Sequence, residues 1–412
     1  MVKRYGGRAA RGAGVAAVCL SLVVACSTTT SEVSQRTTVD RSDRVASWTA
    51  GAASLGRWSP GRVSRSARSP DRIERRIAAM TLRDKIRQLL VLAYGGTRAP
   101  TDLIRRFHPG GLISFSDNLV SDGQIRAMNS RSQRVARHTG QPLLLMTDQE
   151  GGPVTRLPGT QGVPGGAEFH GNAPWARRTA LHTGRTMRSL GLNVDLAPVA
   201  DVNTVGHRGV IGDRSFSSHP YVAARLVRAQ VCGYHQGRVA ATAKHFPGHG
   251  STTTDSHLRP ARIRESKRVW RHTDLPPFAR AVRAGVDMIM VGHLSFPAMD
   301  RTGRPATISP LLDKRLLRHD LGFRGVVITD ALTMRGITAY GSAGSIAVRA
   351  IRSGVDLLLM TPRPALAVRG IAAAVHQGKL GVGRINASVR RILVLKQRLG
   401  LYRASEHLER CR

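Results

Sequence analysis

The stretch that decides the fold is "RGVVITDALTM", residues 324–334, in which a short apolar run ends directly at the charged Asp330. Runs of this kind, closed by glycine or polar residues, are typical of strands that are buried on both faces of a parallel sheet. Seven more runs follow the same pattern: "LLVLAYGG" (89–96), "GGLISFSDN" (110–118), "PLLLMTDQEGG" (142–152), "LNVDLAPVADVN" (192–203), "VAATAKHFPG" (239–248), "GVDMIMVGHLSF" (285–296) and "GVDLLLMTP" (354–362). The chain therefore contains eight predicted strands.

Segments with helical periodicity lie between these runs, such as residues 121–140 and 221–236. Thr81 is placed to cap a helix that runs through Leu89, and residues 385–402 form a last amphipathic segment. Eight strand and helix units predict an α/β fold, a (β/α)₈ TIM-type barrel with one catalytic domain. An open doubly wound sheet is the alternative, but neither GxGxxG nor GxxxxGK[ST] follows any of the runs.

The N-terminus differs in composition from everything after it. Residues 1–25 combine a basic start with the apolar stretch "AGVAAVCLSLVVA", and small residues precede Cys26. This arrangement resembles a bacterial lipoprotein signal peptide, with Cys26 as the lipidated residue, and predicts export and anchoring on the outer face of the cell membrane. An ordinary secretory signal is the alternative. Residues 26–74, rich in Ser, Thr and Arg, are expected to be a disordered tether, residues 75–402 the barrel, and residues 403–412 a polar tail.

The chain has 63 basic and 26 acidic residues, a formal net charge of +37. Such a charge favours anionic neighbours, here an anionic membrane or wall surface. The arginines are scattered and no nucleic-acid-binding module is recognisable, so no nucleic acid partner is expected. A general preference for arginine over the whole surface is the simpler alternative. After signal cleavage, Cys232 and Cys411 would be the only cysteines besides Cys26, which implies no disulfide framework.

Charged and imidazole side chains occur where the predicted strands end. They are Asp148, Glu150, Asp201, Lys244, His245, His293 and Asp330. Since barrel active sites lie at the carboxyl ends of the strands, this set predicts a polar pocket there. Each residue alone has a simpler interpretation, because Asp330 could cap the next helix and Asp148 could fix a turn.

The stretch "KHFPGHGSTTTDSH", residues 244–257, could be a metal site, a nucleotide loop or a catalytic loop. His245 and His249 are four residues apart, and two histidines at that spacing need a helix to bring both imidazoles to one zinc ion. Pro247 and Gly248 disfavour a helix here, so no metal is expected. "STTTDSH" is also a poor match to a phosphate-binding loop that opens a helix. As a catalytic loop, Asp255 would orient His257, whose imidazole could donate and then accept a proton.

Four motifs together resemble glycoside hydrolase family 3, within it the NagZ-type β-N-acetylglucosaminidases, over residues 75–402: "KHFPGHG…DSH", "DQEGGPVTRL", "GDRSFSS" and "GVVITDALTM". The resemblance implies that Asp330 is the nucleophile, His257 the acid/base and Asp255 its orienting partner. It also implies a set of sugar-binding residues in the −1 subsite: Asp148, Arg156, Arg214, Lys244 and His245. The chain departs from the family at Gln149, often histidine, and at Ala331, often acidic.

The activity implied by this resemblance is retaining hydrolysis that removes terminal GlcNAc from peptidoglycan fragments, by a monomer without a cofactor. A histidine acid does not repel an anion as a carboxylate would, so a GlcNAc or glucoside phosphorylase is an alternative, as is a β-glucosidase. A non-catalytic, wall-binding lipoprotein is a further alternative, which the presence of all the expected catalytic residues disfavours.

Overall fold

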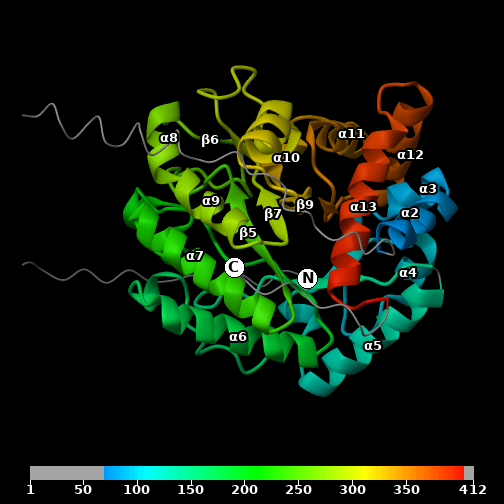
Figure 1. Cartoon of the computed structure of the whole chain (residues 1–412), viewed down its shortest axis with the longest axis horizontal. Helices are drawn as coiled ribbons and strands as arrows, with labels where there is room; N and C mark the ends of the chain where they lie inside the picture. Colours follow the sequence, from blue (N-terminus) through cyan, green and yellow to red (C-terminus); the bar gives the residue numbers. More distant parts are fainter. Residues whose placement is uncertain (1–68, 139, 403–412) are drawn as a thin grey trace, which may run out of the picture. The chain divides into compact units, whose positions relative to one another are not determined.

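The computed structural model describes residues 69–138 and 140–402, and within them eight parallel strands form one sheet (Figure 1). The strands are β1 (Leu90–Ala93), β2 (Gly111–Ile113), β3 (Leu144–Thr147), β4 (Val194–Asp195), β5 (Ala240–Phe246), β7 (Met288–Val291), β9 (Val326–Thr329) and β10 (Leu358–Leu359). Their order is β10-β1-β2-β3-β4-β5-β7-β9, and a bridge between Ile328 and Leu357 joins β9 to β10. The sheet is thus nearly closed, and the prediction of a (β/α)₈ barrel is confirmed.

Helices surround the strands (Figure 1). They are α2 (Ser69–Ala79), α3 (Leu82–Arg87), α4 (Thr101–Phe107), α5 (Asp122–His138), α6 (Ala173–Ser189), α7 (Pro220–Gln236), α8 (Lys267–Thr273), α9 (Leu275–Arg283), α10 (Arg335–Thr338), α11 (Ala343–Ser353), α12 (Pro364–His376) and α13 (Val382–Arg398). A π-helix spans Leu311–Asp320, and β6 (Ala261–Arg262) pairs with β8 (Leu294–Ser295) outside the barrel. Among the described residues, no helix is long and apolar enough to cross a bilayer.

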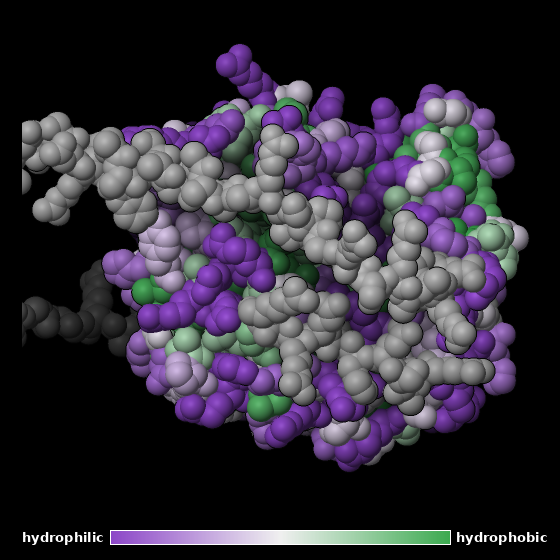
Figure 2. All heavy atoms as spheres, in the orientation of Figure 1, coloured by the Kyte–Doolittle hydropathy of each residue, from purple (hydrophilic) through white to green (hydrophobic). Residues whose placement is uncertain are grey.

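Each of the eight strands lies within one of the eight predicted apolar runs. All seven residues of β5 are buried, and so are all four of β3, β7 and β9. This burial on both faces, by the barrel interior and by the helices, explains why the strands are continuous apolar runs instead of alternating ones. Figure 2 shows hydrophilic residues spread over the visible face, in keeping with the scattered arginines of the sequence.

One predicted helix end is wrong, and the first described helix starts earlier than expected. α2 spans Ser69–Ala79, so it already covers six residues before the predicted start of the barrel at residue 75, and its residues Ile73 and Ile77 form a buried apolar face. The helix capped by Thr81 ends at Arg87 and not at Leu89, since β1 begins at Leu90. The signal peptide, Cys26, the rest of the tether and residues 403–412 lie outside the described residues.

Asp356, a buried carboxylate just before the last strand, contacts three arginine side chains. Its oxygens accept hydrogen bonds from Arg384 at 3.2 Å and Arg391 at 3.1 Å, and from Arg318. Burial favours the neutral acid, but these arginines outweigh it and lower the pKa of Asp356. The network ties the π-helix and α13 to the barrel.

Replacing Asp356 with asparagine is expected to lower the free energy of unfolding by about 3 kcal/mol, because guanidinium groups would lose their buried counter-ion. The matched control is Glu74→Gln, which removes an exposed ion pair with Arg390 and should cost less than about 1 kcal/mol. Urea unfolding at pH 7 measures both. Because the pKa of Asp356 is lowered on folding, its contribution to the free energy of unfolding should be lost as the pH falls below about 4. Equal losses of stability in the Asp356 and Glu74 variants would contradict this account.

Candidate active site

The predicted nucleophile, Asp330, directly follows β9 at the carboxyl end of the barrel, and the residue is only 9% exposed. One carboxylate oxygen accepts the N–H of Ala331 at 2.7 Å. Burial alone would raise the pKa of Asp330, but the electrostatic influence of His245 and His293, together with the Ala331 N–H, lowers it below 3.8. The carboxylate is therefore ionised at neutral pH, as a nucleophile must be.

The predicted acid/base pair lies on the loop that follows β5. Nδ1 of His257 is 2.8 Å from Oδ1 of Asp255, and the same oxygen accepts the backbone N–H of His257 at 2.8 Å. Because an ionised carboxylate can only accept, Nδ1 carries a proton and Nε2 is left to exchange protons with a ligand. The imidazole is 65% exposed, so Nε2 is accessible.

Backbone hydrogen bonds fix this loop to the segment that carries Asp330. The N–H of Arg335 donates to the carbonyl of His257 at 3.1 Å, and the N–H of Gly336 donates to the carbonyl of Ser256 at 2.9 Å. Arg335 opens α10, immediately after the β9 turn. His257 is also among the groups that lower the pKa of Asp330. The predicted nucleophile and the predicted acid/base thus lie at the same end of the barrel.

A second cluster joins the ends of β3 and β5. Nζ of Lys244, which is buried, lies 2.6 Å from Asp148 and 2.6 Å from Glu150. Glu150 also accepts two hydrogen bonds from the guanidinium of Arg214, at 2.8 and 2.9 Å. Although burial opposes both shifts, these contacts lower the pKa of Glu150 and raise that of Lys244. Two of the predicted sugar-binding residues, Lys244 and Arg214, therefore meet at Glu150, and Lys244 connects them to a third, Asp148.

The sequence pattern places Glu150 at the end of a predicted strand but does not predict a role for it. The structure makes it the shared counter-ion of Lys244 and Arg214, which approach from segments far apart in the chain. Its position two residues after Asp148, at the end of a buried strand, is the signal that could have identified it.

His245 is oriented by Asp201, another residue at a strand end. Nδ1 of His245 is 2.7 Å from one carboxylate oxygen, and the other oxygen accepts the N–H groups of His245 at 3.1 Å and His249 at 2.7 Å. Asp201 therefore fixes both the imidazole and the backbone at the start of the predicted catalytic loop. Nε2 of His245 remains for a ligand.

Arg156 is positioned through its backbone. Oε1 of Gln149 accepts the N–H groups of Arg156 at 2.7 Å and Leu157 at 3.0 Å, so the glutamine that departs from the family pattern stabilises this turn. The guanidinium lies 5.8 Å from the ring centre of Phe115, and its buried Nε has no hydrogen-bond partner within the described part of the chain.

Comparison with known proteins supports the same interpretation. Residues 81–395 match the model of the glycosyl hydrolase family 3 N terminal domain. The chain belongs to glycoside hydrolase family 3. The family recognised from the motifs is thereby confirmed.

Three similar proteins can be compared over most of this chain. Beta-hexosaminidase A of Pseudoalteromonas piscicida is 34% identical over 73% of this chain and 55% of its own length. Beta-hexosaminidase of Pseudomonas aeruginosa is 35% identical over 69% of this chain and 85% of its own length. The solved family 3 beta-N-acetylglucosaminidase from Paenibacillus sp. str. FPU-7 is 37% identical, with a TM-score of 0.77 over 80% of this chain and 66% of that one. The chain thus spans little more than half of the first of these relatives.

Two further histidines near the candidate site are buried and make hydrogen bonds within the protein. Nε2 of His249 contacts Oγ of Ser256 at 3.0 Å, and Nε2 of His293 contacts the carbonyl of Ala331 at 2.9 Å. Burial lowers the pKa of both imidazoles. Within residues 69–138 and 140–402, no group of three or more histidine, cysteine or acidic side chains is placed to hold a metal ion.

Replacing Glu150 with glutamine is expected to raise KM and to lower the free energy of unfolding by about 3 kcal/mol, because two buried cations would lose their shared counter-ion. Steady-state kinetics and urea unfolding measure the two effects. Asp122→Asn is the control, since it removes an exposed contact of 3.6 Å with Arg126 and should change stability by less than about 1 kcal/mol. Unaltered KM and stability in the Glu150 variant would show that the carboxylate is dispensable.

Proposed function

We propose that this chain is a retaining exo-β-N-acetylglucosaminidase that removes terminal GlcNAc from peptidoglycan fragments. The observation that carries the proposal is the Asp255–His257 pair, held by backbone hydrogen bonds to the segment that follows Asp330. Relatives named for hexosaminidase and N-acetylglucosaminidase activity support the choice of sugar.

In the first step, a carboxylate oxygen of Asp330 forms a bond to the anomeric carbon while the glycosidic carbon–oxygen bond breaks. Nε2–H of His257 donates its proton to the departing oxygen, and Asp255 stabilises the imidazolium through Nδ1–H. The product of this step is a glycosyl ester on Asp330. The low pKa of Asp330 keeps the carboxylate ionised for the attack and makes it a good leaving group in the second step.

In the second step, neutral Nε2 of His257 accepts a proton from water. The oxygen of that water attacks the anomeric carbon and the ester bond to Asp330 breaks. Two displacements at the same carbon give net retention of configuration. Both groups then return to their starting protonation states.

The cluster around Lys244 is suited to hold the sugar hydroxyls. Lys244, Arg156 and Arg214 supply fixed positive donors, and Asp148 supplies a partly exposed acceptor. Hydrogen bonds to charged groups contribute about 1.5–3 kcal/mol each. Because most of these side chains are already paired within the protein, little ordering remains to be done when a sugar binds.

We place the enzyme outside the cell, anchored through a lipid on Cys26 and acting as a monomer near an anionic membrane or wall surface. The basic and apolar N-terminal segment supports this location. Metabolic labelling with a radioactive fatty acid tests the anchor: label should be found in the wild type and be absent from Cys26→Ala.

A phosphorylase is the second candidate, because the acid/base is an imidazole and an incoming phosphate would meet no carboxylate charge at that position. The test uses GlcNAc-anhydroMurNAc, with and without inorganic phosphate. Hydrolysis predicts free GlcNAc in both reactions, whereas GlcNAc-1-phosphate as the main product would establish phosphorolysis. Turnover of an aryl β-glucoside in preference to the matching GlcNAc glycoside would instead indicate a β-glucosidase.

A further inference from the structure

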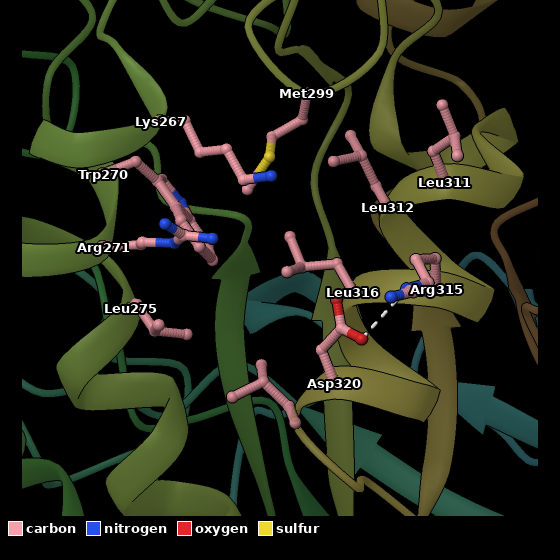
Figure 3. A pocket seen from close by; sticks show the side chains of 11 residues that line it. Lys267, Trp270, Arg271, Leu275, Met299, Leu311, Leu312, Arg315, Leu316 and Asp320 are labelled. Carbon is pink, nitrogen blue, oxygen red and sulfur yellow. Dashed lines mark hydrogen bonds and ion pairs between the residues drawn. The ribbon is translucent and has the colours of Figure 1, made fainter. Parts of the chain in front are cut away.

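A cavity of about 720 Å³ lies outside the barrel, between α8, the start of α9 and the π-helix Leu311–Asp320 (Figure 3). Its walls are mainly apolar and come from both sides: Trp270, Leu275, Met299, Leu312, Leu316 and Leu321. None of these side chains belongs to the catalytic machinery. The volume is within the range of pockets that hold small molecules, about 300–1,000 Å³.

Two cations stand at one side of this cavity. Lys267 and Arg271 lie one turn apart on α8, and Figure 3 shows both side chains directed toward the cavity. Within the described part of the chain, neither side chain forms an ion pair. Arg315, on the opposite wall, is already paired with Asp320 at 3.1 Å. Lys267 and Arg271 therefore provide two positive charges that are available to a ligand.

An exposed apolar side chain lies on the opposite wall. Leu311, at the start of the π-helix, lines the cavity and is 49% exposed. The hydrocarbon lining thus continues to the protein surface across the cavity from the two charges. A purely polar ligand would leave these apolar walls in water, and a purely apolar one would leave both cations without partners.

We propose that this cavity binds an amphiphilic anion, an acyl or similar apolar chain that ends in a phosphate or carboxylate. The apolar chain of the ligand would lie against the leucines and Met299, and burial of its methylene groups would favour binding. The head would accept charge-assisted hydrogen bonds from Lys267 and Arg271. Free amphiphiles and anionic membrane lipids share this chemistry, and the site does not depend on the proposed glycosidase reaction.

The first experiment titrates the full chain with dodecyl phosphate, below the concentration at which it forms micelles, by isothermal calorimetry. Dodecanol and inorganic phosphate serve as the chain-only and head-only probes. We expect saturable binding of dodecyl phosphate at one site per chain, and much weaker binding of either fragment. Equal affinity for inorganic phosphate, or no binding of dodecyl phosphate at all, would overturn the proposal.

Matched variants separate this site from the general basic charge of the protein. Lys267→Gln/Arg271→Gln should weaken binding of dodecyl phosphate at least tenfold, the equivalent of about 1.4 kcal/mol. Arg369→Gln/Lys379→Gln removes the same charge from exposed positions elsewhere and should bind as the wild type does. Equal weakening in both double variants would refute the site. Thermal unfolding confirms that each variant is folded.

Two further experiments test the apolar wall of the cavity and the source of the ligand. Leu316→Ser should weaken dodecyl phosphate binding and leave the unfolding midpoint close to that of the wild type, since Leu316 is only partly buried. Sedimentation with phosphatidylglycerol vesicles, compared with phosphatidylcholine vesicles, then tests membrane lipid as the source. Loss of vesicle binding only in the Lys267/Arg271 variant assigns the lipid, whereas binding of soluble dodecyl phosphate alone assigns a free amphiphile. Wild-type affinity in the Leu316 variant would contradict an apolar binding wall.

Discussion

Asp330→Ala is expected to lower kcat on a GlcNAc aryl glycoside by about 10⁴-fold or more, because no other group would form the covalent bond to the anomeric carbon. The carboxylate is almost buried and held in its ionised form by neighbouring histidines. Release of p-nitrophenol measures the loss, and thermal unfolding confirms that the variant is folded.

Chemical rescue makes this expectation specific. In Asp330→Ala, a small anion such as azide can occupy the space of the lost carboxylate and attack from the same face. The product should then be the α-glycosyl azide, formed by a single displacement with inversion. Activity close to that of the wild type without azide, or rescue that yields only the β-azide, would contradict the role of Asp330.

The second large effect concerns the acid/base. His257→Ala is expected to lower kcat on a disaccharide substrate by about 10²–10⁴-fold, the usual contribution of general acid–base catalysis. An aryl glycoside with a good leaving group needs no proton for the first step, so it should give a rapid burst of phenol, followed by slow turnover limited by hydrolysis of the ester. Stopped-flow absorbance measures burst and steady state separately.

His319→Ala is the matched control for this variant. His319 is also an exposed histidine whose Nδ1 lies 2.8 Å from an adjacent carboxylate, Asp320, but it belongs to the π-helix. Its replacement should leave kcat and KM unchanged. A His257 variant with neither a burst nor a loss of turnover would show that another group transfers the proton.

The strands were the most predictable part of the fold. Each is buried on both faces, so its sequence is a continuous apolar run, and the residue at its carboxyl end stands out because it is charged, as with Asp148, Lys244 and Asp330. The start of α2 was missed because its basic composition resembles that of the preceding residues. Only the spacing of Ile73 and Ile77 marks the buried face.

Pairings between distant residues could not be read from single positions. The catalytic loop was predictable because Asp255 and His257 are two residues apart and Pro247 disfavours the helix that a zinc pair would need. The contact of His245 with Asp201 and the two cations on Glu150 join segments far apart in sequence. Such contacts are fixed by the closure of the barrel, and no local pattern encodes them.

The most direct test of the central claim, that Asp330 and His257 act on the same anomeric carbon, is to trap the covalent intermediate. The enzyme is incubated with a 5-fluoro GlcNAc glycoside that carries a good leaving group, and is then digested and analysed by mass spectrometry. The account predicts one sugar per chain, attached to Asp330 in the tryptic peptide 325–335, with the same adduct formed but released more slowly in His257→Ala. A sugar attached to any other side chain, or full turnover of substrate without an adduct, would contradict it.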